Sequence, residues 1–259
     1  MSCAIIGGTG VEHLSLEQRE DHSVHTPYGQ VAVAAGYLQG QQVFFLSRHG
    51  HDHSLPPHLV NYRGNLWALH HLGVSKIIAT AAVGSISPAL QLGMLVLPDQ
   101  FIDFTKQRAT TFYQGENGVL HVDMSEPYCP GMREVIRRSA AQLALAMHSG
   151  GVYVCTEGPR FETPAEIRMF RQWGGDMVGM TGVPEVVLAR ELGMCYATVA
   201  MVTNAAAGIA DHPLTHAEGV EATRSLSQTI ADLFVNILAN VPEERYCRCA
   251  QAALERGKF

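Results

Sequence analysis

Cys3-Ala4-Ile5-Ile6-Gly7-Gly8-Thr9-Gly10 lies near the N-terminus and combines a short apolar run with a glycine-rich turn. Its first four residues are small or apolar and suit a buried strand, and the three glycines suit a tight turn directly after that strand. The N-terminus has neither a basic region nor a signal-peptide cleavage site, so we interpret it as the first strand of the fold. A strand that runs into a glycine turn is typical of α/β proteins.

The rest of the chain alternates short apolar runs with longer segments of helical period, which also favours an α/β fold. The predicted strands are 3–7, 30–37, 42–48, 75–82, 94–102, 151–155 and 195–202. Four residues join 30–37 to 42–48, so these two should form a hairpin within a mixed sheet. With 259 residues and no evident linker or repeat, we expect one domain over residues 1–259.

The predicted helices have clear boundary signals. Apolar residues of 131–147 fall on one stripe, and segment 184–192 ends at Gly193, a suitable residue just beyond a helix. Thr163-Pro164-Ala165-Glu166 and Thr215-His216-Ala217-Glu218 are capping boxes, in which a threonine and a glutamate bond reciprocally to the backbone of the first turn. The second box opens a long helix.

Composition excludes several classes of function. A net charge of −6 argues against nucleic acid or an anionic membrane as partner, and no run of about 18 apolar residues exists to span a bilayer. Charged residues make up 16% of the chain, against roughly 25% in average domains. Such a surface is consistent with an oligomer.

The cysteines are scattered along the chain and contain no C-x-x-C pair; they are Cys3, Cys129, Cys155, Cys195, Cys247 and Cys249. We interpret them as free thiols in a reducing cytoplasm. Cys247-x-Cys249 is too sparse by itself for a zinc site.

Two early segments could bind an anion. Glycine backbone N–H groups at 7–10 can approach an anion closely and Thr9 adds a hydroxyl, although a plain tight turn explains the same residues. The segment lacks the ending of a P-loop and the third glycine of a dinucleotide fingerprint. Ser47–His53 contains Arg48, whose planar fork suits a phosphate dianion, and His49 as a further donor. The alternatives there are a metal site of His49, His51 and His53, or a polar loop.

Three later segments each connect a strand to a loop or helix, where sites of α/β proteins usually lie. In 155–163, Phe161 can stack on a flat ligand and Glu162 can accept a hydrogen bond from a ring N–H. Thr181 combines a hydroxyl with a helix N-terminus, which suits an anion. Asn204 stands at the mouth of an apolar strand and can donate and accept at once. Capping of helices alone would also explain these segments.

Together, these segments resemble the purine nucleoside phosphorylase family, in particular its methylthioadenosine/methylthioinosine branch. The resemblance covers almost the whole chain and is specific because the motifs occur together in order. They are Ile5–Gly10, Arg48-His49-Gly50, Val60–Asn65, Asp99–Asp103, Glu157–Thr163 and Met180–Glu185.

The resemblance implies a central mixed sheet, partly barrel-like, flanked by helices. It implies a cytoplasmic, metal-free pentosyltransferase that needs no cofactor and uses inorganic phosphate as co-substrate. It also implies a homotrimer, or a hexamer, in which His121 is contributed to a neighbouring site. The implied phosphate contacts are Thr9, Arg48, His49, Thr181 and the backbone at Ala82. The implied nucleoside contacts are Phe161, Glu162, Met180, Asn204 and Ala206.

This sequence departs from the adenosine-type pattern in its base pocket. It has Asn204-Ala205-Ala206 where methylthioadenosine phosphorylases have an Asp-x-Asp pair, and Glu162 where they commonly have serine. A carboxylate accepts from the N1–H of a 6-oxopurine and repels the N1 lone pair of adenine. We therefore expect phosphorolysis of 6-oxopurine ribonucleosides, with methylthioadenosine as the alternative substrate.

The resemblance leaves the 5′ end of the nucleoside open. His216 matches the position at which inosine/guanosine phosphorylases bind a 5′-hydroxyl, whereas the branch resemblance favours 5′-methylthioinosine. Ala81 stands where some relatives have a phosphate-binding hydroxyl. Two other classes remain as alternatives: a metal-dependent hydrolase or deaminase that uses the three histidines, and a non-catalytic nucleotide-binding module built on Gly7–Gly10.

Overall fold

A computed structural model describes residues 2–8, 11, 15–50, 54–115, 118–209 and 213–257. Its strands are β1 (Ser2–Gly7), β2 (Glu17–Thr26), β3 (Gly29–Leu38), β4 (Gln41–Ser47), β5 (Val74–Ser85), β6 (Leu95–Leu97), β7 (Gln100–Phe104), β8 (Val119–Val122), β9 (Met147–Ser149), β10 (Val152–Thr156), β11 (Met177–Gly179), β12 (Cys195–Ala205) and β13 (Ala253–Gly257). Its helices are α1 (Tyr62–His71), α2 (Pro130–Gln142), α3 (Pro164–Gln172), α4 (Gly182–Glu191) and α5 (His216–Asn240), with short 3-10 turns η2 (Pro57–Leu59) and η3 (Cys249–Gln251).

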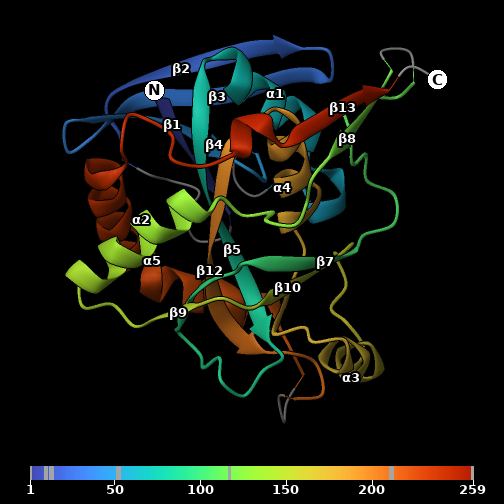
Figure 1. The fold of residues 1–259 in the computed structure, drawn as a ribbon. Coiled ribbons are helices and arrows are strands. Elements are labelled where there is room, and N and C mark those ends of the chain that lie inside the picture. Colours follow the sequence, from blue (N-terminus) through green and yellow to red (C-terminus); the bar gives the residue numbers. More distant parts are fainter. Residues whose placement is uncertain are drawn as a thin grey trace.

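The sheet is mixed and branches at β5 (Figure 1). One side of β5 pairs with β1 along its first half and with β11 near its end, while β12 runs parallel along the other side. Beyond β1 the order continues through β4, β3 and β2, and beyond β11 through β10 and β7. Strands β1, β4, β5 and β12 are mutually parallel, so their carboxyl ends meet at one edge.

Side chains of the central strands point alternately to the two faces of the sheet, and this divides the core into two layers. Ile77 of β5 packs in the cluster that contains Val186 of α4, whereas Ile78 packs in the cluster that contains Ile230 of α5. Successive side chains of a strand point to opposite faces, so each face of the sheet needs its own helical cover. Figure 1 shows α2 and α5 together on one side, and α1 contacts α4 on the other.

The fold class expected from the sequence is confirmed, and so are the helix caps. The side chains of Thr163 and Thr215 each accept a hydrogen bond from the backbone N–H of the glutamate three residues later. The side chain of that glutamate accepts in return from the backbone N–H of the threonine. Gly193 follows α4 with φ +66°, the left-handed conformation in which glycine is favoured. The hairpin of β3 and β4 is antiparallel, as predicted.

Two predicted boundaries were wrong. Segment 94–102 is two strands, because Pro98 cannot donate to a ladder: β6 pairs with β12 and β9, whereas β7 pairs with β10. The helix predicted over 131–147 ends at Gln142, since Ala144 adopts a left-handed φ of +52° and Met147 then enters β9. Alanine is a strong helix former, so nothing in the sequence marked this end.

The sequence also missed elements outside the central ladder. Edge strand β2 is polar and largely exposed, and β8 and β13 form a separate two-stranded sheet. Helix α1 was missed as well. None of the described helices combines the length and the apolar character needed to cross a bilayer.

Candidate active site

A cavity of about 420 Å³ lies at the edge where the parallel strands end. Its volume is within the range of roughly 300–1,000 Å³ typical of small-molecule sites. The cavity brings together the predicted site residues Arg48, His49, Ala82, Phe161, Glu162, Met180, Thr181, Asn204 and Ala206. They come from the ends of β4, β5, β11 and β12 and from the loop before α3, so the topology explains their assembly.

The other predicted site residues are not placed in this cavity. Thr9 lies outside the described residues, as do His51 and His53 of the alternative metal site. The backbone of His216 begins α5, and the neighbouring Leu214 and Thr215 line the cavity, but the side chain of His216 is outside what the structure describes. His121 is on β8, exposed and away from this cavity in the same chain.

Arg48 is fixed by a partner that the sequence analysis did not identify. Its Nε and Nη2 each donate to one carboxylate oxygen of Glu185, both at 2.7 Å, and its Nη1 donates to the Thr80 carbonyl at 2.8 Å. The side chains of Arg48 and Glu185 are 1% and 0% exposed. Burial disfavours the charged form of Arg48, but the carboxylate of Glu185 outweighs it and the pKa of Arg48 lies above its ordinary value.

Only part of the Arg48 fork therefore remains for an anion. A guanidinium has five N–H groups, and three of them are used by Glu185 and Thr80. Within the described residues, one N–H on each terminal nitrogen has no partner, and Arg48 lines the cavity. The two groups are held on a rigid plane, which suits two oxygens of one phosphate.

Glu185 is the main residue that the sequence analysis quoted without giving it a role. It lies in the first turn of α4, accepts a third hydrogen bond from the Tyr196 hydroxyl at 2.7 Å, and is flanked by Pro184 and Val186. A carboxylate among buried apolar residues is seldom found without a charged partner. That signal was available in the sequence.

One N–H of the glycine turn is already used within the protein. The N–H of Gly8 donates to Thr80 Oγ1 at 2.8 Å, so it serves the protein rather than an anion. A Cβ at Gly8 would lie 2.6 Å from Arg48 Nη1 and 3.1 Å from the Thr80 carbonyl oxygen. Glycine is required here because Arg48 passes close to the backbone.

Replacing Gly8 by alanine should displace the Arg48 guanidinium and lower kcat/KM for phosphate by about 100-fold, the usual cost of misplacing a binding group by an ångström. Initial rates at varied phosphate concentration would measure the change. Gly131→Ala is the matched control, because a Cβ there meets no atom closer than 3.8 Å. Equal kinetics for the two variants would contradict the role given to Gly8.

His49 and Thr181 complete the anion end. His49 Nδ1 lies 2.8 Å from the Leu55 carbonyl, which can only accept, so Nδ1 carries a proton and the ring is oriented. Thr181 is the N-cap of α4, and no hydrogen bond from its side chain caps the helix. Thr181 lines the cavity directly before α4, and the regular turns of that helix begin only after Val183, whose φ of −120° and ψ of 133° are not helical.

The opposite end of the cavity has the features of a base pocket. Phe161 is 38% exposed and Glu162 is 8% exposed, and both line the cavity. Thr156 Oγ1 donates to Glu162 Oε1 at 2.6 Å, which holds the carboxylate in place. Burial raises the pKa of Glu162 from its usual 4.5, and the Thr156 hydrogen bond opposes that rise.

Asn204 lies at the end of β12, half-buried, with its amide bonded locally. Its Nδ2 donates to the Ala205 carbonyl at 2.8 Å and its Oδ1 accepts from Thr203 Oγ1 at 2.9 Å. An amide oxygen has two lone pairs and an amide nitrogen two protons, so each atom retains capacity for a ligand.

Comparison with known proteins agrees with this geometry. A model of the phosphorylase superfamily matches residues 2–239. The chain belongs to this superfamily. The matched span contains every residue that lines the cavity, whereas the segment from residue 240 onwards, with Cys247, Cys249 and β13, lies beyond it.

Within the superfamily, the chain is similar over almost its full length to several phosphorylases. A 6-oxopurine nucleoside phosphorylase from Pyrococcus furiosus is 51% identical over 255 residues, 96% of each chain. A probable S-methyl-5'-thioinosine phosphorylase from Methanopyrus kandleri is 50% identical over 249 residues, also 96% of each. An S-methyl-5'-thioadenosine phosphorylase from P. furiosus is 46% identical over 248 residues, 95% of each.

The fold is shared with solved members of the superfamily. A methylthioadenosine phosphorylase from Schistosoma mansoni, solved in complex with adenine, has a TM-score of 0.91 and 31% identity. The match covers 97% of this chain and 96% of that one. The family resemblance seen in the sequence is thereby confirmed.

Proposed function

We propose that this phosphorylase cleaves 6-oxopurine ribonucleosides with inorganic phosphate, giving the free base and a ribose 1-phosphate or its 5-methylthio analogue. The observation that carries the proposal is the buried carboxylate of Glu162, oriented by Thr156, in the same cavity as Arg48. Two of the relatives at about 50% identity have names that describe this activity or its methylthioinosine form. Purine salvage is the corresponding cellular role.

The donor pattern of the base supports this choice over methylthioadenosine. A 6-oxopurine presents an N1–H donor beside an O6 acceptor, whereas adenine presents a bare N1 beside an amino donor. The Glu162 carboxylate only accepts, and the Asn204 amide can donate to O6 or N7. A buried site with the wrong donor pattern leaves polar groups unpaired and can reject a ligand by factors of about 10⁴.

The anion end supports direct displacement at C1′. Phosphate oxygen attacks C1′, the bond from C1′ to N9 breaks, and its electron pair leaves with the purine. Arg48 holds the phosphate while His49 and Thr181 orient it, so proximity supplies much of the rate. The phosphate also places negative charge beside the cationic sugar of the transition state. Thr9 and the backbone at Ala82 are further proposed phosphate contacts.

The residues proposed to bind the purine would also help the base to leave. Electron density that arrives on the ring accumulates at N7, which needs a proton or a strong hydrogen bond. We assign that donation to the Nδ2 of Asn204, while Phe161 stacks on the ring and Met180 contacts the ribose. In this scheme phosphate is a co-substrate and the chemistry uses no cofactor.

The proposal extends to assembly. A homotrimer, or a hexamer of related arrangement, would place His121 of one chain at the sugar end of a neighbouring cavity. Support comes from the single-chain geometry: His121 is exposed on a ribbon away from its own cavity, and Phe161 is 38% exposed at the cavity wall. His216 at the start of α5 is assigned to the 5′ end of the nucleoside.

One assay tests the function. The protein is incubated with phosphate and, separately, 5′-methylthioinosine, inosine, guanosine or 5′-methylthioadenosine, and the free base is followed by chromatography. We expect release of hypoxanthine or guanine that depends on phosphate, and the ratio of the first two substrates fixes the 5′ preference. Equal rates in phosphate-free buffer, or preference for methylthioadenosine, would contradict the proposal.

A further inference from the structure

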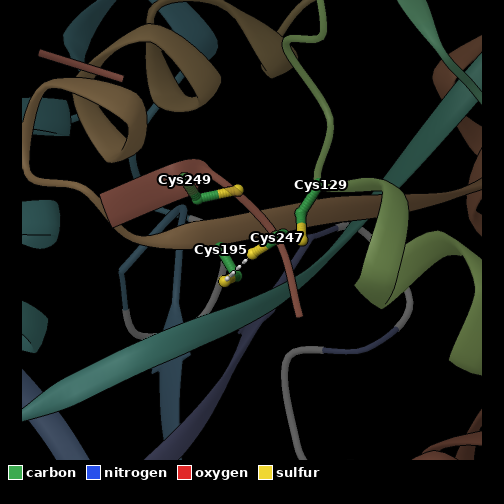
Figure 2. Close-up of side chains that lie close together, drawn as sticks. All are labelled: Cys129, Cys195, Cys247 and Cys249. Carbon is green, nitrogen blue, oxygen red and sulfur yellow. Dashed lines mark hydrogen bonds between the residues drawn. The ribbon is translucent and has the colours of Figure 1, made fainter. Parts of the chain in front are cut away.

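Four of the six cysteines gather at one point, although the sequence analysis interpreted all six as separate thiols. The Sγ atoms of the four lie within 4.8 Å of one another, and Cys195 and Cys247 are 3.4 Å apart. Figure 2 shows the side chains converging from distant parts of the chain; they are Cys129, Cys195, Cys247 and Cys249. None of them lines the cavity of the proposed active site.

The spacing of the sulfurs matches a tetrahedral metal site. A Zn²⁺ ion bound by four thiolates at about 2.3 Å places the sulfurs about 3.8 Å apart. The observed separations lie on both sides of this value, so movements of the order of an ångström would complete the coordination. Cys129, Cys195 and Cys249 are buried and Cys247 is half-buried, which leaves the site enclosed as in structural zinc sites.

The surroundings favour negative charge on the sulfurs. Arg190 is 5% exposed, and its Nη1 donates to Cys249 Sγ at 3.3 Å while its Nη2 donates to the Asp123 carbonyl. Within the part of the chain that the structure describes, Arg190 forms no ion pair with a carboxylate. A buried guanidinium needs an anion, and a neutral thiol is a poor substitute.

A backbone donor points to the same conclusion. Cys129 is the N-cap of α2, and its sulfur accepts from the N–H of Met132 at 3.4 Å. The positive end of a helix favours a thiolate over a thiol. Donors that surround the sulfurs in this way orient the ligands of a metal and offset the double negative charge of a zinc tetrathiolate.

We propose that this cluster is a structural zinc site, with Cys129, Cys195, Cys247 and Cys249 as ligands. Binding replaces the four thiol protons by one Zn²⁺ and releases them to solvent, with no change of oxidation state. The ligands come from the start of α2, the start of β12 and the segment after α5. The metal therefore ties the segment beyond the superfamily match to the core, next to η3 and β13.

Metal analysis of the purified full chain tests the proposal. The protein is produced in zinc-supplemented medium, purified without chelator, and measured by plasma mass spectrometry together with a count of reactive thiols before and after denaturation. We expect one zinc per chain, and four thiols that become reactive only when zinc is released. Cobalt substitution should give the intense visible bands of a tetrahedral thiolate site.

Variants identify the ligands. Cys247→Ala should lose the zinc and make residues 241–257 more sensitive to limited proteolysis, because two elements of that segment depend on the site. Cys247 is the least buried of the four, so this variant disturbs the core least. Cys3→Ala is the matched control, since Cys3 is a buried cysteine outside the cluster, and it should keep the metal.

Several outcomes would overturn the proposal. One is a native chain that has free thiols and takes up no zinc after anaerobic reduction and incubation with the ion. A second is an intact mass lower by two hydrogens per cysteine pair, which would show disulfides in place of a metal. The others are iron or copper in the site, and zinc that remains in both Cys247→Ala and Cys195→Ala. The measurements on the native chain decide the matter even if a variant does not fold.

Discussion

Replacing Glu185 by glutamine should lower kcat/KM for phosphate by at least about 100-fold, the scale of losing one oriented donor in an active site. Glutamine keeps the size of the side chain but removes its charge, so the buried guanidinium of Arg48 loses its counter-ion. Its amide also presents N–H groups where Arg48 needs two acceptors. Arg48 should then turn away from the cavity or attract a water or anion in a new position.

The same substitution should destabilise the fold. Breaking a buried ion pair from one side typically costs about 3–5 kcal/mol, and the hydrogen bond from the Tyr196 hydroxyl would then go to a neutral amide oxygen instead of a carboxylate. Thermal unfolding and denaturant titration would measure this loss. Phosphate kinetics should be recorded at a temperature at which the variant is fully folded.

Glu191→Gln provides the matched control for that experiment. Glu191 is on the same helix, is 9% exposed, and accepts from the Phe112 N–H rather than from Arg48. Its replacement should leave kcat/KM for phosphate unchanged. If Glu185→Gln and Glu191→Gln had equal phosphate kinetics, Glu185 would have no part in positioning Arg48.

Replacing Glu162 by glutamine should change which base is accepted. The glutamine amide can donate to the bare N1 of adenine, whereas the carboxylate of Glu162 repels that lone pair. The neutral amide oxygen also binds the N1–H of a 6-oxopurine more weakly than the carboxylate does. We expect the ratio of kcat/KM for inosine-type over adenosine-type nucleosides to fall by about 100-fold or more. Parallel assays with inosine, adenosine and their methylthio analogues would give the ratio.

The pH profile offers an independent readout of Glu162. The ionised carboxylate accepts from N1–H more strongly than the protonated acid does, so activity on 6-oxopurines should fall as pH drops through the pKa of Glu162. Because burial raises that pKa, the loss should begin at a higher pH than an exposed glutamate, with its usual 4.5, would give. Glu162→Gln should lack this acidic limb. An unchanged profile and an unchanged substrate ratio would remove Glu162 from the base pocket.

The sequence was sufficient for the parts of the fold that obey a simple pattern. The central strands β1, β5 and β12 are mostly apolar and almost wholly buried, and the caps of α3 and α5 follow a local rule. The grouping of Arg48, Ala82 and Asn204 could be predicted because they lie at the ends of parallel strands. Thr181 follows β11, which runs antiparallel to β5, so its place in the cavity needed the structure. The family resemblance then supplied their roles.

What was missed depends on contacts between distant segments. Arg48 and Glu185 are 137 residues apart, and no local pattern pairs them. Cys195 and Cys247 are separated by a strand and a long helix, so their proximity follows only from the packing of the segment after α5. Edge strand β2 lacked the apolar alternation that a strand with one covered face would show.

The Arg48 guanidinium is shared between Glu185 and the proposed phosphate site, and this has a consequence for turnover. A lone buried guanidinium would hold a phosphate dianion very tightly, and it would hold the sugar phosphate formed from it equally well. Glu185 neutralises the charge of Arg48 before any substrate arrives, so in the proposed mechanism oriented N–H groups, rather than an unbalanced cation, hold the phosphate. We therefore expect the sugar phosphate to dissociate readily from this pocket.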